Sequence, residues 1–454
     1  MPRLTPTVEQ EAAIERIVSE PSGGVIQASD LGTGKTLMAV EAALRFAGDG
    51  VIVVSAPLHT YYGWFDTLFG QTNGARQFRK VDNKTKRGKS NLEALQWGTK
   101  GWYFVGREFF RLQDWSGIPI DVMVHDECHS LQNRKSRGFK TARNVDARLT
   151  IAQSATWFGS SFEGAWAVLR VVYPDHDGIG MFADRSYHRW VRNWCQTEYD
   201  HFAEGNLRIV GEKTLGNLAK EIPCYINLRN TATETPEFVN VYVDLSTRQR
   251  TLYSQMERDG VAWLTDNPMV AELPITQRVR LRQLTLGETV VSDDDVVDFD
   301  MNCKSSKLDA VVGLLDDLVG EQVVIATDSA KFARVVAARV GGFAWTGDVS
   351  QVDREDAKQK FMNKKLRIIV ATQAAISEGT DGLQRACRVL IELSKSDSPI
   401  LNQQMVGRLN RTGQDKRVVV YRVMARDTLD DPQANTLLNK ELQMRASMLK
   451  NDKG

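Results

Sequence analysis

The sequence predicts an α/β protein in which parallel sheets are covered by helices, and two observations carry that prediction. First, continuous apolar runs recur, as is typical of strands buried on both faces of a parallel sheet. These runs are residues 51–57, 102–105 and 122–124 in the first half of the chain, and 323–326, 366–371, 389–393 and 418–423 in the second. Second, helical stretches alternate with the runs, at 37–46, 308–318 and 330–340. This alternation indicates a layered fold with a strand and helix series in each half.

Length, charge and cysteine content narrow the class of protein. The chain has 454 residues, which suggests two or three domains. Its 58 basic and 57 acidic residues give a net charge of +1, which neither indicates nor excludes a nucleic-acid partner. Five scattered cysteines without a C-x-x-C pair favour reduced thiols over disulfides or a zinc site. We find no signal peptide and no run of about 18 apolar residues, so we expect a cytoplasmic protein without a membrane span.

A glycine-containing loop, ASDLGTGKT at residues 28–36, lies between an apolar run and a helical stretch. Gly32 and Gly34 allow backbone conformations in which successive N–H groups point at an anion. Lys35 would reach the β- and γ-phosphates of a nucleotide, and the Thr36 hydroxyl would hold Mg²⁺. Ser29 stands where the general phosphate-loop pattern has glycine. A glycine-rich turn that happens to precede lysine and threonine is the alternative, which the strand and helix around it disfavour.

The apolar run 122–124 leads into the sequence HDECH at residues 125–129. Two carboxylates at the carboxyl end of a parallel strand lie where such sheets place their chemistry. Asp126 would hold Mg²⁺, and Glu127 would accept a proton from an attacking water. An exposed acidic turn is the alternative. His129 could couple the nucleotide state to the site, or be a structural hydrogen-bonding group. Cys128 is interpreted as packing, because no base adjoins it.

Residues 4–18 predict a turn at Pro6 followed by a helix with Val8, Ala12, Ile14 and Val18 on its inward face. Gln10 is either an exposed helix position or a reader of an adenine edge, since its amide offers a donor and an acceptor. Two basic clusters could neutralise phosphates, or be solvated surface. Their members are Arg76, Arg79, Lys80, Lys84, Lys86, Arg87 and Lys89 in the first, and Arg134, Lys135, Arg137, Lys140, Arg143 and Arg148 in the second.

The middle of the chain has a looser pattern. A strand over 149–152 leads into Ser154-Ala155-Thr156. Residues 157–229 contain scattered aromatics in mostly helical stretches, which favour an inserted helical subdomain over a base-stacking surface. Residues 229–237 predict a linker. A strand over 239–243, a helix over 247–264 and an acidic surface loop over 292–300 are expected after it.

The sequence QQMVGRLNRTGQ at residues 403–414 places Arg408 and Arg411 three residues apart, which predicts that they share one face of a helix. A guanidinium at a γ-phosphate would stabilise negative charge in the transition state of phosphoryl transfer. An R-x-x-R pair alone is more often a solvated surface. Gln404 and Gly407 beside the pair make the motif more specific.

Taken together, these motifs resemble those of superfamily 2 helicase-type motors, and within them the SNF2 family. The phosphate loop is similar to that family's A-D-E-M-G-L-G-K-T, and by this likeness Asp30 and Thr33 join Gly32, Gly34, Lys35 and Thr36 at the nucleotide. Asp126 to His129 match a D-E-x-H box, and Ser154 to Thr156 the coupling motif. Ala56-Pro57-Leu58 with Trp64 resembles a motif that contacts the nucleic-acid backbone. SEGTDGLQ at 377–384 resembles one that touches nucleic acid and nucleotide, which implies roles for Gly379 and Asp381.

The resemblance implies two RecA-like lobes, residues 1–230 with a helical insertion at about 157–229, and residues 231–454 with the arginine motif. It implies ATP and Mg²⁺ as cofactors, with Glu127, Gln404, Arg408 and Arg411 as catalytic residues and Gln10 at the base. The expected partner is double-stranded DNA, and the expected activity is ATP-driven translocation or displacement of bound proteins. We expect a monomer in the cytoplasm of a bacterium or of a phage-infected host.

Two other functions fit the same residues. A helicase that separates the strands of DNA or RNA would also need a wedge element, which the sequence does not reveal. An ATP-gated module that binds DNA and recruits a partner would need no translocation. The intact set Lys35, Glu127, Arg408 and Arg411 argues against an inactive ATP site, and so against the second alternative.

Overall fold

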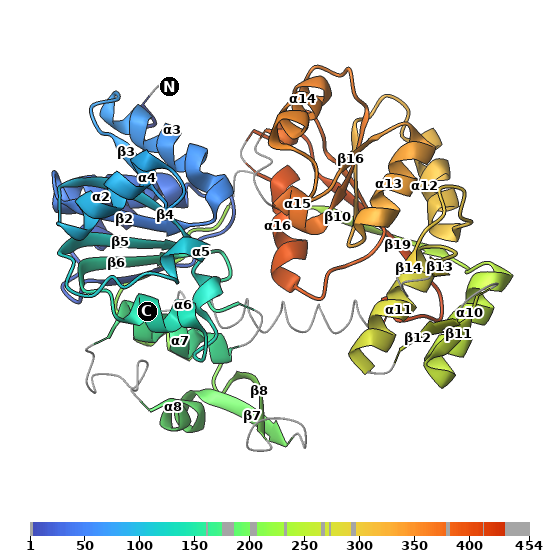
Figure 1. Ribbon diagram of the computed structural model, residues 1–454, viewed down its shortest axis with the longest axis horizontal. Coiled ribbons are helices and arrows are strands. Elements are labelled where there is room, and N and C mark those ends of the chain that lie inside the picture. Colours follow the sequence, from blue (N-terminus) through green and yellow to red (C-terminus); the bar gives the residue numbers. More distant parts are fainter. Residues whose placement is uncertain are drawn as a thin grey trace. The chain divides into compact units, whose positions relative to one another are not determined.

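The computed structural model describes residues 3–159, 162–174, 186–199, 207–230, 234–264, 268–271, 274–291, 297–377, 382–411 and 413–431. The chain divides into two compact units between Asn230 and Thr231. The first unit contains the phosphate loop and the acidic pair, and the second contains the arginine motif. Each unit is built on its own parallel sheet, so the predicted α/β class with two sheets is confirmed (Figure 1).

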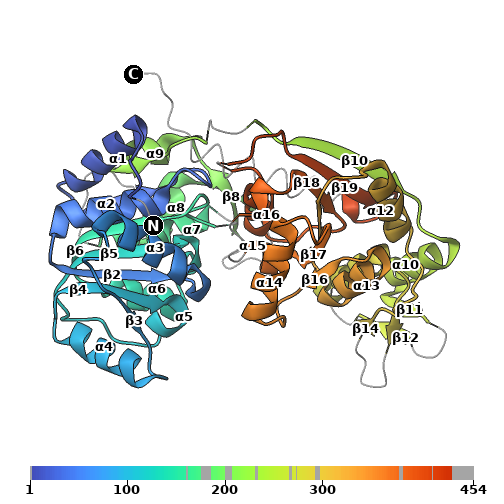
Figure 2. The same cartoon turned by 90° about the horizontal axis from the view of Figure 1, so that it is seen from above.

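The first unit has a parallel sheet in the order β3-β4-β2-β5-β6-β1-β9. Its strands are β1 (Gly24–Gln27), β2 (Val51–Ala56), β3 (Phe78–Val81), β4 (Gly101–Gly106), β5 (Ile120–Asp126), β6 (Ala147–Gln153) and β9 (Tyr225–Ile226). Alternate side chains point to opposite faces of a strand, so both faces of these apolar runs are buried. Helices α1 (Val8–Val18), α2 (Lys35–Ala47) and α3 (Tyr61–Thr72) cover one face, where Ile52, Val54, Val122 and Val124 form the core (Figure 2).

Other elements surround this sheet. Helices α5 (Arg107–Phe110) and α7 (Glu163–Val172) contact it through β2, β4, β1 and β6, and α6 (Arg137–Arg143) packs on α7. Helix α4 (Lys86–Gln96) packs on the edge strand β3. The segment predicted as a mostly helical insertion also contains an antiparallel hairpin, β7 (Cys195–Tyr199) with β8 (Leu207–Glu212), beside α8 (Tyr187–Trp194) (Figure 1). After α9 (Asn217–Glu221), the segment returns to the sheet, because β9 pairs with β1.

The predicted inward face of the first helix is wrong in part. Thr7 caps α1 through its hydroxyl, so the helix begins at Val8 and turns that side chain outward, 88% exposed. Ala13, Ile14 and Ile17 are the residues that α1 buries. Ala12, another residue of the predicted inward face, is also exposed.

The second unit has a parallel sheet in the order β10-β19-β18-β15-β17-β16. Its strands are β10 (Glu237–Val243), β15 (Val323–Thr327), β16 (Phe343–Trp345), β17 (Ile368–Thr372), β18 (Val389–Glu392) and β19 (Val419–Ala425). Helices α12 (Ser306–Asp317) and α13 (Ala330–Val340) cover one face. Helices α14 (Gln351–Met362), α15 (Gln373–Ser377) and α16 (Pro399–Leu409) cover the other (Figure 1). Ile325 and Val324 illustrate the alternation, since they lie in the cores of opposite faces.

A smaller apolar core joins the elements between β10 and α12. These are α10 (Thr247–Asp259), the hairpin of β11 (Val261–Trp263) and β12 (Pro268–Val270), α11 (Pro274–Leu286), and the pair β13 (Val290–Val291) and β14 (Val297–Asp298). The helix predicted to reach residue 264 ends at Asp259, because Gly260 adopts a left-handed conformation with φ 67° and starts the hairpin. Residues 292–296 of the predicted acidic loop lie outside the described residues. We call this group of elements, the described residues between 244 and 298, the accessory subdomain.

Candidate active site

The loop that joins β1 to α2 binds the ammonium group of Lys35 through its backbone carbonyls. Gly32 and Gly34 have φ angles of 81° and 82°, a left-handed conformation that favours glycine. The Lys35 ammonium donates to the backbone carbonyls of Ser29 and Asp30, each at 2.9 Å. Helix α2 starts at that lysine, so its first N–H groups face the loop. This is the backbone form that binds an anion at a helix N-terminus.

The structure explains why Ser29 occupies the position where the general phosphate-loop pattern has glycine. Its side chain is fully buried, and its hydroxyl accepts a hydrogen bond from the backbone N–H of Leu228 at 3.0 Å. The neighbouring Asp30 carboxylate accepts from the N–H of Asn230 at 3.2 Å and lies 3.6 Å from the guanidinium of Arg229. The loop is therefore fixed to the segment that follows β9. A role for Asp30 in cofactor binding stays a prediction.

Gln10 lies against the phosphate loop, although it is 23 residues from its contact there. Its side-chain N–H donates to the carbonyl of Thr33 at 2.8 Å, and its side-chain oxygen accepts from the N–H of Thr7 at 2.9 Å. A Cβ at Gly34 would lie 2.5 Å from the Gln10 nitrogen. Close approach is thus a second reason for glycine at that position. The interpretation of Gln10 as an adenine reader stays a prediction.

Asp126, the last residue of β5, has hydrogen-bond donors on both carboxylate oxygens. The Trp64 indole N–H donates to Oδ2 at 3.0 Å. The Gln153 side-chain amide and the backbone N–H of Glu127 donate to Oδ1 at 2.9 and 3.1 Å. Burial and the adjacent negative charge of Glu127 nevertheless raise the pKa of Asp126. The site therefore contains a partly compensated carboxylate in a fixed orientation.

Glu127 adopts a left-handed backbone conformation, with φ 51°. Its carboxylate accepts a hydrogen bond from the Ser154 hydroxyl at 2.8 Å and lies 3.3 Å from Nδ1 of His129. Burial alone would raise the pKa of Glu127, but His129, Lys35 and the Ser154 hydroxyl lower it to about 2. The carboxylate is ionised at neutral pH, the state in which it can accept a proton from water.

His129 and Ser154 connect the acidic pair to the next strand. Nδ1 of His129 lies 3.2 Å from the Ser154 hydroxyl, which itself donates to Glu127. Ser154 follows β6 directly. The acidic turn and the serine-alanine-threonine sequence thus form one polar cluster at the carboxyl edge of the sheet.

The donor set in the first unit fits a divalent cation. Asp126 and Glu127 are adjacent acidic groups, and the charge of Glu127 raises the pKa of Asp126. A divalent cation would offset that repulsion, and carboxylate, hydroxyl and water oxygens are the ligands that Mg²⁺ takes. Asp126 and the Thr36 hydroxyl, at the second position of α2, are the groups that would hold it. Glu127 would remain for an attacking water.

The arginine motif lies in the second unit, and one prediction about it is wrong. Gln404 and Arg408 lie on α16, but the helix ends at Leu409, so Arg411 does not share its face. Asn410 leaves the helical conformation with ψ 76°. The side chain of Gln414 then donates to two carbonyls of the segment before β18, each at 2.8 Å, and turns the chain back.

Gly379 and Asp381, the other two predicted cofactor contacts, lie outside the described residues. Their motif is described only at its ends. At one of these ends, the N–H of Gly382 donates to the Gln384 side-chain oxygen at 3.0 Å. The roles predicted for these two residues stay predictions.

The first basic cluster is not a loop, since much of it forms β3 and α4. The Arg79 guanidinium donates to the Tyr103 hydroxyl at 2.9 Å, and the Lys80 ammonium lies 5.6 Å from the centre of the Tyr61 ring. Arg76 pairs with Asp49. The remaining members, Lys84, Lys86, Arg87 and Lys89, are exposed. This edge of the sheet therefore displays positive charge beside aromatic rings.

Two members of the second basic cluster, Arg134 and Arg148, make contacts with other side chains of the protein. The Arg134 guanidinium lies 4.0 Å from the centre of the Tyr187 ring and 3.8 Å from the carboxylate of Glu163. Arg148 pairs with Asp121 at 2.8 Å. The contacts of Arg134 link the segment before α6 to the insertion, whereas the Arg148 pair joins β6 to β5. Phosphate binding by either cluster stays a prediction.

The cysteines and the apolar segments can also be compared with the structure. All five cysteines are buried and free, and burial raises the pKa of the Cys128 thiol well above its usual value. Cys128 thus packs in the core, as predicted. In the described part of the chain, the helices are too short or too polar to cross a membrane.

Trp64, Gln153 and the arginines of α11 are the polar partners that sequence reasoning missed. The sequence indicates Trp64 only as part of a motif that resembles a nucleic-acid contact, and its hydrogen bond to Asp126 was not predicted. Gln153 was visible as the residue before the serine-alanine-threonine sequence. The position of a glutamine at the end of a strand, next to an acidic strand end, is the signal that could have identified it.

Residues 306–413 match the protein family described as the helicase conserved C-terminal domain. This range starts with α12 and continues past α16. It includes Gln404, Arg408 and Arg411. The phosphate loop, the acidic pair and the accessory subdomain lie outside it.

Three curated relatives illustrate the wider similarity. The uncharacterized ATP-dependent helicase YqhH of Bacillus subtilis is 19% identical over 95% of this chain and 77% of its own length. The uncharacterized ATP-dependent helicase MG018 of Mycoplasma genitalium is 22% identical over 68% of this chain and 29% of its own. Protein CHROMATIN REMODELING 24 of Arabidopsis thaliana is 22% identical over 70% and 33%. The chain thus spans about a third or less of two of these relatives.

Among solved structures, the chain is similar to the Sulfolobus solfataricus SWI2/SNF2 ATPase core in complex with dsDNA. That similarity has a TM-score of 0.45 and 16% sequence identity, and it covers 98% of this chain and 94% of the other.

Proposed function

We propose that this chain is a member of the SNF2 family of superfamily 2 helicase-type ATPases, and that it hydrolyses ATP with Mg²⁺ and thereby moves along double-stranded DNA. The observation that carries the hydrolytic part is the ionised Glu127, held by Ser154 and His129 beside the lysine of the phosphate loop. A carboxylate fixed in this way suits the activation of water. Family relatives named as ATP-dependent helicases support the use of ATP.

Each residue of the proposed site has a distinct task. The loop N–H groups and Lys35 would bind the phosphates, and Asp126 and Thr36 would hold Mg²⁺, whose charge would neutralise the phosphate oxygens. Glu127 orients the attacking water and takes its proton. Arg408 and Arg411 of the second unit stabilise the charge that develops on the transferred phosphoryl group.

Double-stranded DNA is the proposed track for two reasons. The exposed lysines of the first basic cluster would bind phosphates, and such binding weakens as salt rises. In addition, the name of the Arabidopsis thaliana relative refers to chromatin remodelling. The activity that we propose on this track is translocation without strand separation.

A strand-separating helicase is the second candidate function. It is favoured by the names of the two bacterial relatives, which are called ATP-dependent helicases. The two functions differ in the product, because a helicase releases single strands and a translocase leaves the duplex intact.

The test measures ATP hydrolysis alone, with duplex DNA, with single-stranded DNA and with RNA, at low and moderate salt. We expect duplex DNA to stimulate hydrolysis strongly and salt to weaken that effect. Stimulation by single strands or RNA alone would favour the helicase, as would separation of a blunt duplex. Absence of stimulation by any polymer would favour an ATP-gated binding module. Light scattering of the same preparation tests the proposed monomer.

A further inference from the structure

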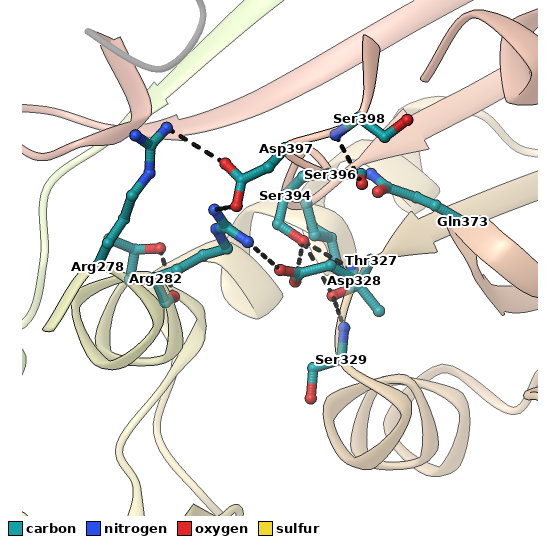
Figure 3. A network of polar contacts seen from close by, with 12 residues as sticks. Arg278, Arg282, Thr327, Asp328, Ser329, Gln373, Ser394, Ser396, Asp397 and Ser398 are labelled. Carbon is teal, nitrogen blue, oxygen red and sulfur yellow. Dashed lines mark hydrogen bonds and ion pairs between the residues drawn. The ribbon is translucent and has the colours of Figure 1, made fainter. Parts of the chain in front are cut away.

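Arg282 of α11 joins two acidic side chains at the carboxyl edge of the second sheet (Figure 3). Its guanidinium donates to Asp328 at 3.2 Å and to Asp397 at 2.7 Å. Asp328 follows β15, and Asp397 lies between β18 and α16. The Arg282 side chain is only 9% exposed, and Arg278, one turn earlier on α11, adds a second ion pair to Asp397 at 3.2 Å. Arg282 thus connects the accessory subdomain to the segment that starts α16.

That segment is in turn bound to α16 itself. The side chain of Asn402 donates to the carbonyl of Ser396 at 2.9 Å and accepts from its N–H at 3.1 Å. The Ser398 hydroxyl caps the helix by accepting the N–H of Leu401. A displacement of residues 394–398 would therefore displace the first turns of α16, the helix that carries Gln404 and Arg408.

The other end of the bridge is also fixed. The Ser394 hydroxyl donates to Asp328 at 2.6 Å, and the Gln373 side chain donates to the Ser394 carbonyl at 2.5 Å (Figure 3). On the side of α11, the buried Gln249 of α10 donates to the Leu284 carbonyl at 3.0 Å. Arg282 therefore connects two well-packed parts of the second unit.

We propose that Arg282 is a positioning residue that fixes the start of α16 and so sets the placement of Arg408. A guanidinium presents several donors in a rigid fork, so it can hold two carboxylates at once. Without it, Asp328 and Asp397 would lose the cation that they share. The effect on hydrolysis rests on the function proposed above, whereas the effect on α16 does not.

Simple surface pairing does not account for this arrangement. Exposed ion pairs contribute little because water screens them, but Arg282 is buried and contacts two separate segments. The contact also spans 115 residues and starts outside the region 306–413 that matches the helicase C-terminal family. We infer that the accessory subdomain acts on the arginine motif through this side chain.

The first measurement is hydrogen exchange of the full chain, with the Arg282→Gln variant compared with wild type. Backbone amides of residues 401–405 should exchange about tenfold faster, whereas amides of β15 should not change. The Arg367→Gln variant is the matched control. Arg367 donates to the carbonyls of Leu315, Leu318 and Glu321, at the opposite end of the same sheet. We expect this control to leave α16 unchanged.

A second variant covers the case in which Arg282→Gln fails to fold. Asp397 is 55% exposed, so Asp397→Asn is expected to fold and to reproduce the faster exchange of α16. Unchanged exchange of α16 in Arg282→Gln and Asp397→Asn would overturn the proposal. Equally fast exchange in Arg367→Gln would also overturn it, because the effect would then be a general loss of stability.

The catalytic consequence is measured by steady-state ATP hydrolysis. In Arg282→Gln, kcat should fall roughly tenfold to a hundredfold, while KM for ATP stays within about twofold because the phosphate loop lies in the first unit. Arg282→Lys keeps the charge but not the fork, and should give an intermediate kcat. If α16 loosens and kcat does not change, Arg282 does not position Arg408. If wild type hydrolyses no ATP but α16 still loosens, the positioning holds and the proposed function fails.

Discussion

The two sheets each carry a pair of acidic side chains at the carboxyl ends of their strands, and the protein compensates these pairs differently. In the first sheet, Asp126 receives mainly neutral donors, from Trp64, Gln153 and a backbone N–H. In the second sheet, Asp328 and Asp397 receive the guanidinium of Arg282. The same edge of the same kind of fold therefore presents two different electrostatic environments.

This difference teaches what separates a reactive edge from a structural one. Neutral donors orient a carboxylate without cancelling its charge, so the first pair keeps its capacity for a cation. A guanidinium cancels the charge of the carboxylates and fixes the segments that carry them, so the second pair serves as a rigid connection between those segments. Substitutions in three places should test this difference: at the acidic pair of the first sheet, in the arginine motif, and at the hydrogen-bond donors around the acidic pairs.

The largest effect is expected from Arg408→Ala. If Arg408 stabilises charge on the transferred phosphoryl group, its loss should lower kcat on the order of a thousandfold. Single-turnover hydrolysis measures this, and fluorescent ADP measures binding. Arg388→Ala is the control, since Arg388 pairs with Glu321 at the other end of the second sheet. A kcat within about tenfold of wild type would mean that Arg408 does not act in hydrolysis. The ion pairs of Arg282 would then have no effect on catalysis through Arg408.

A somewhat smaller loss is expected from Glu127→Gln. The amide keeps the size of the side chain but cannot take a proton, so hydrolysis should fall about a hundredfold or more. ADP binding should hardly change, because the phosphate loop is intact. Glu321→Gln, which removes a carboxylate from an ion pair in the second unit, controls for loss of charge. Retained hydrolysis in Glu127→Gln would mean that the first acidic pair is also only structural.

The buried edge of the first sheet should also depend on pH. Burial lowers the pKa of His125 from 6.5 to about 3, so the folded state keeps this ring neutral while the unfolded state binds a proton. Stability is therefore complete above pH 6.5 and is lost as pH falls from there toward 3. Between pH 7 and 5 the loss should be about 2 kcal/mol. Urea unfolding at a series of pH values measures it.

The control for this experiment is a difference between two variants. His125→Gln should flatten the dependence of unfolding free energy on pH, whatever its own stability. His188→Gln, at an exposed position of α8, should leave that dependence as in wild type. If His125→Gln keeps the full dependence, another group causes it, and the electrostatic contrast between the two edges is weaker than proposed.

The sequence predicted those parts of the fold and site that are encoded locally. Apolar runs marked most strands of both sheets within a residue or two, since burial on both faces leaves a continuous pattern. The phosphate loop was visible because Gly32 and Gly34 are needed for its left-handed turns. The acidic pair was visible because it directly follows an apolar strand.

Features that depend on contacts distant in sequence were missed. Trp64 and Asp126 are 62 residues apart, and Arg282 and Asp397 are 115 apart. Nothing in a local pattern links such residues. Helix α14 was also missed, because it buries only Ala357 and Phe361 and shows little apolar periodicity. The prediction that Arg408 and Arg411 share one helix face was wrong because α16 ends at Leu409. After the two arginines, the Gln414 side chain donates to the carbonyls of Gln384 and Cys387.

The smallest effect is expected from Trp64→Phe, which directly tests the neutral donors. Phenylalanine keeps an aromatic ring but removes the N–H that holds Oδ2 of Asp126. Groups that orient a metal ligand typically change metal affinity by 10- to 100-fold when lost, and we expect the lower limit here because two other donors remain. The Mg²⁺ concentration for half-maximal ADP binding should therefore rise about tenfold.

The chain provides a close control in Trp102→Phe. Trp102 is also buried in the first sheet, but its indole N–H has no hydrogen-bond partner among the residues that the structure describes. Both variants lose similar ring volume, so a common packing defect would affect both equally. A higher Mg²⁺ requirement in Trp64→Phe alone would assign the effect to the Asp126 hydrogen bond. Equal requirements would mean that the carboxylate keeps its orientation without the indole, and that burial rather than neutral donors distinguishes the reactive edge.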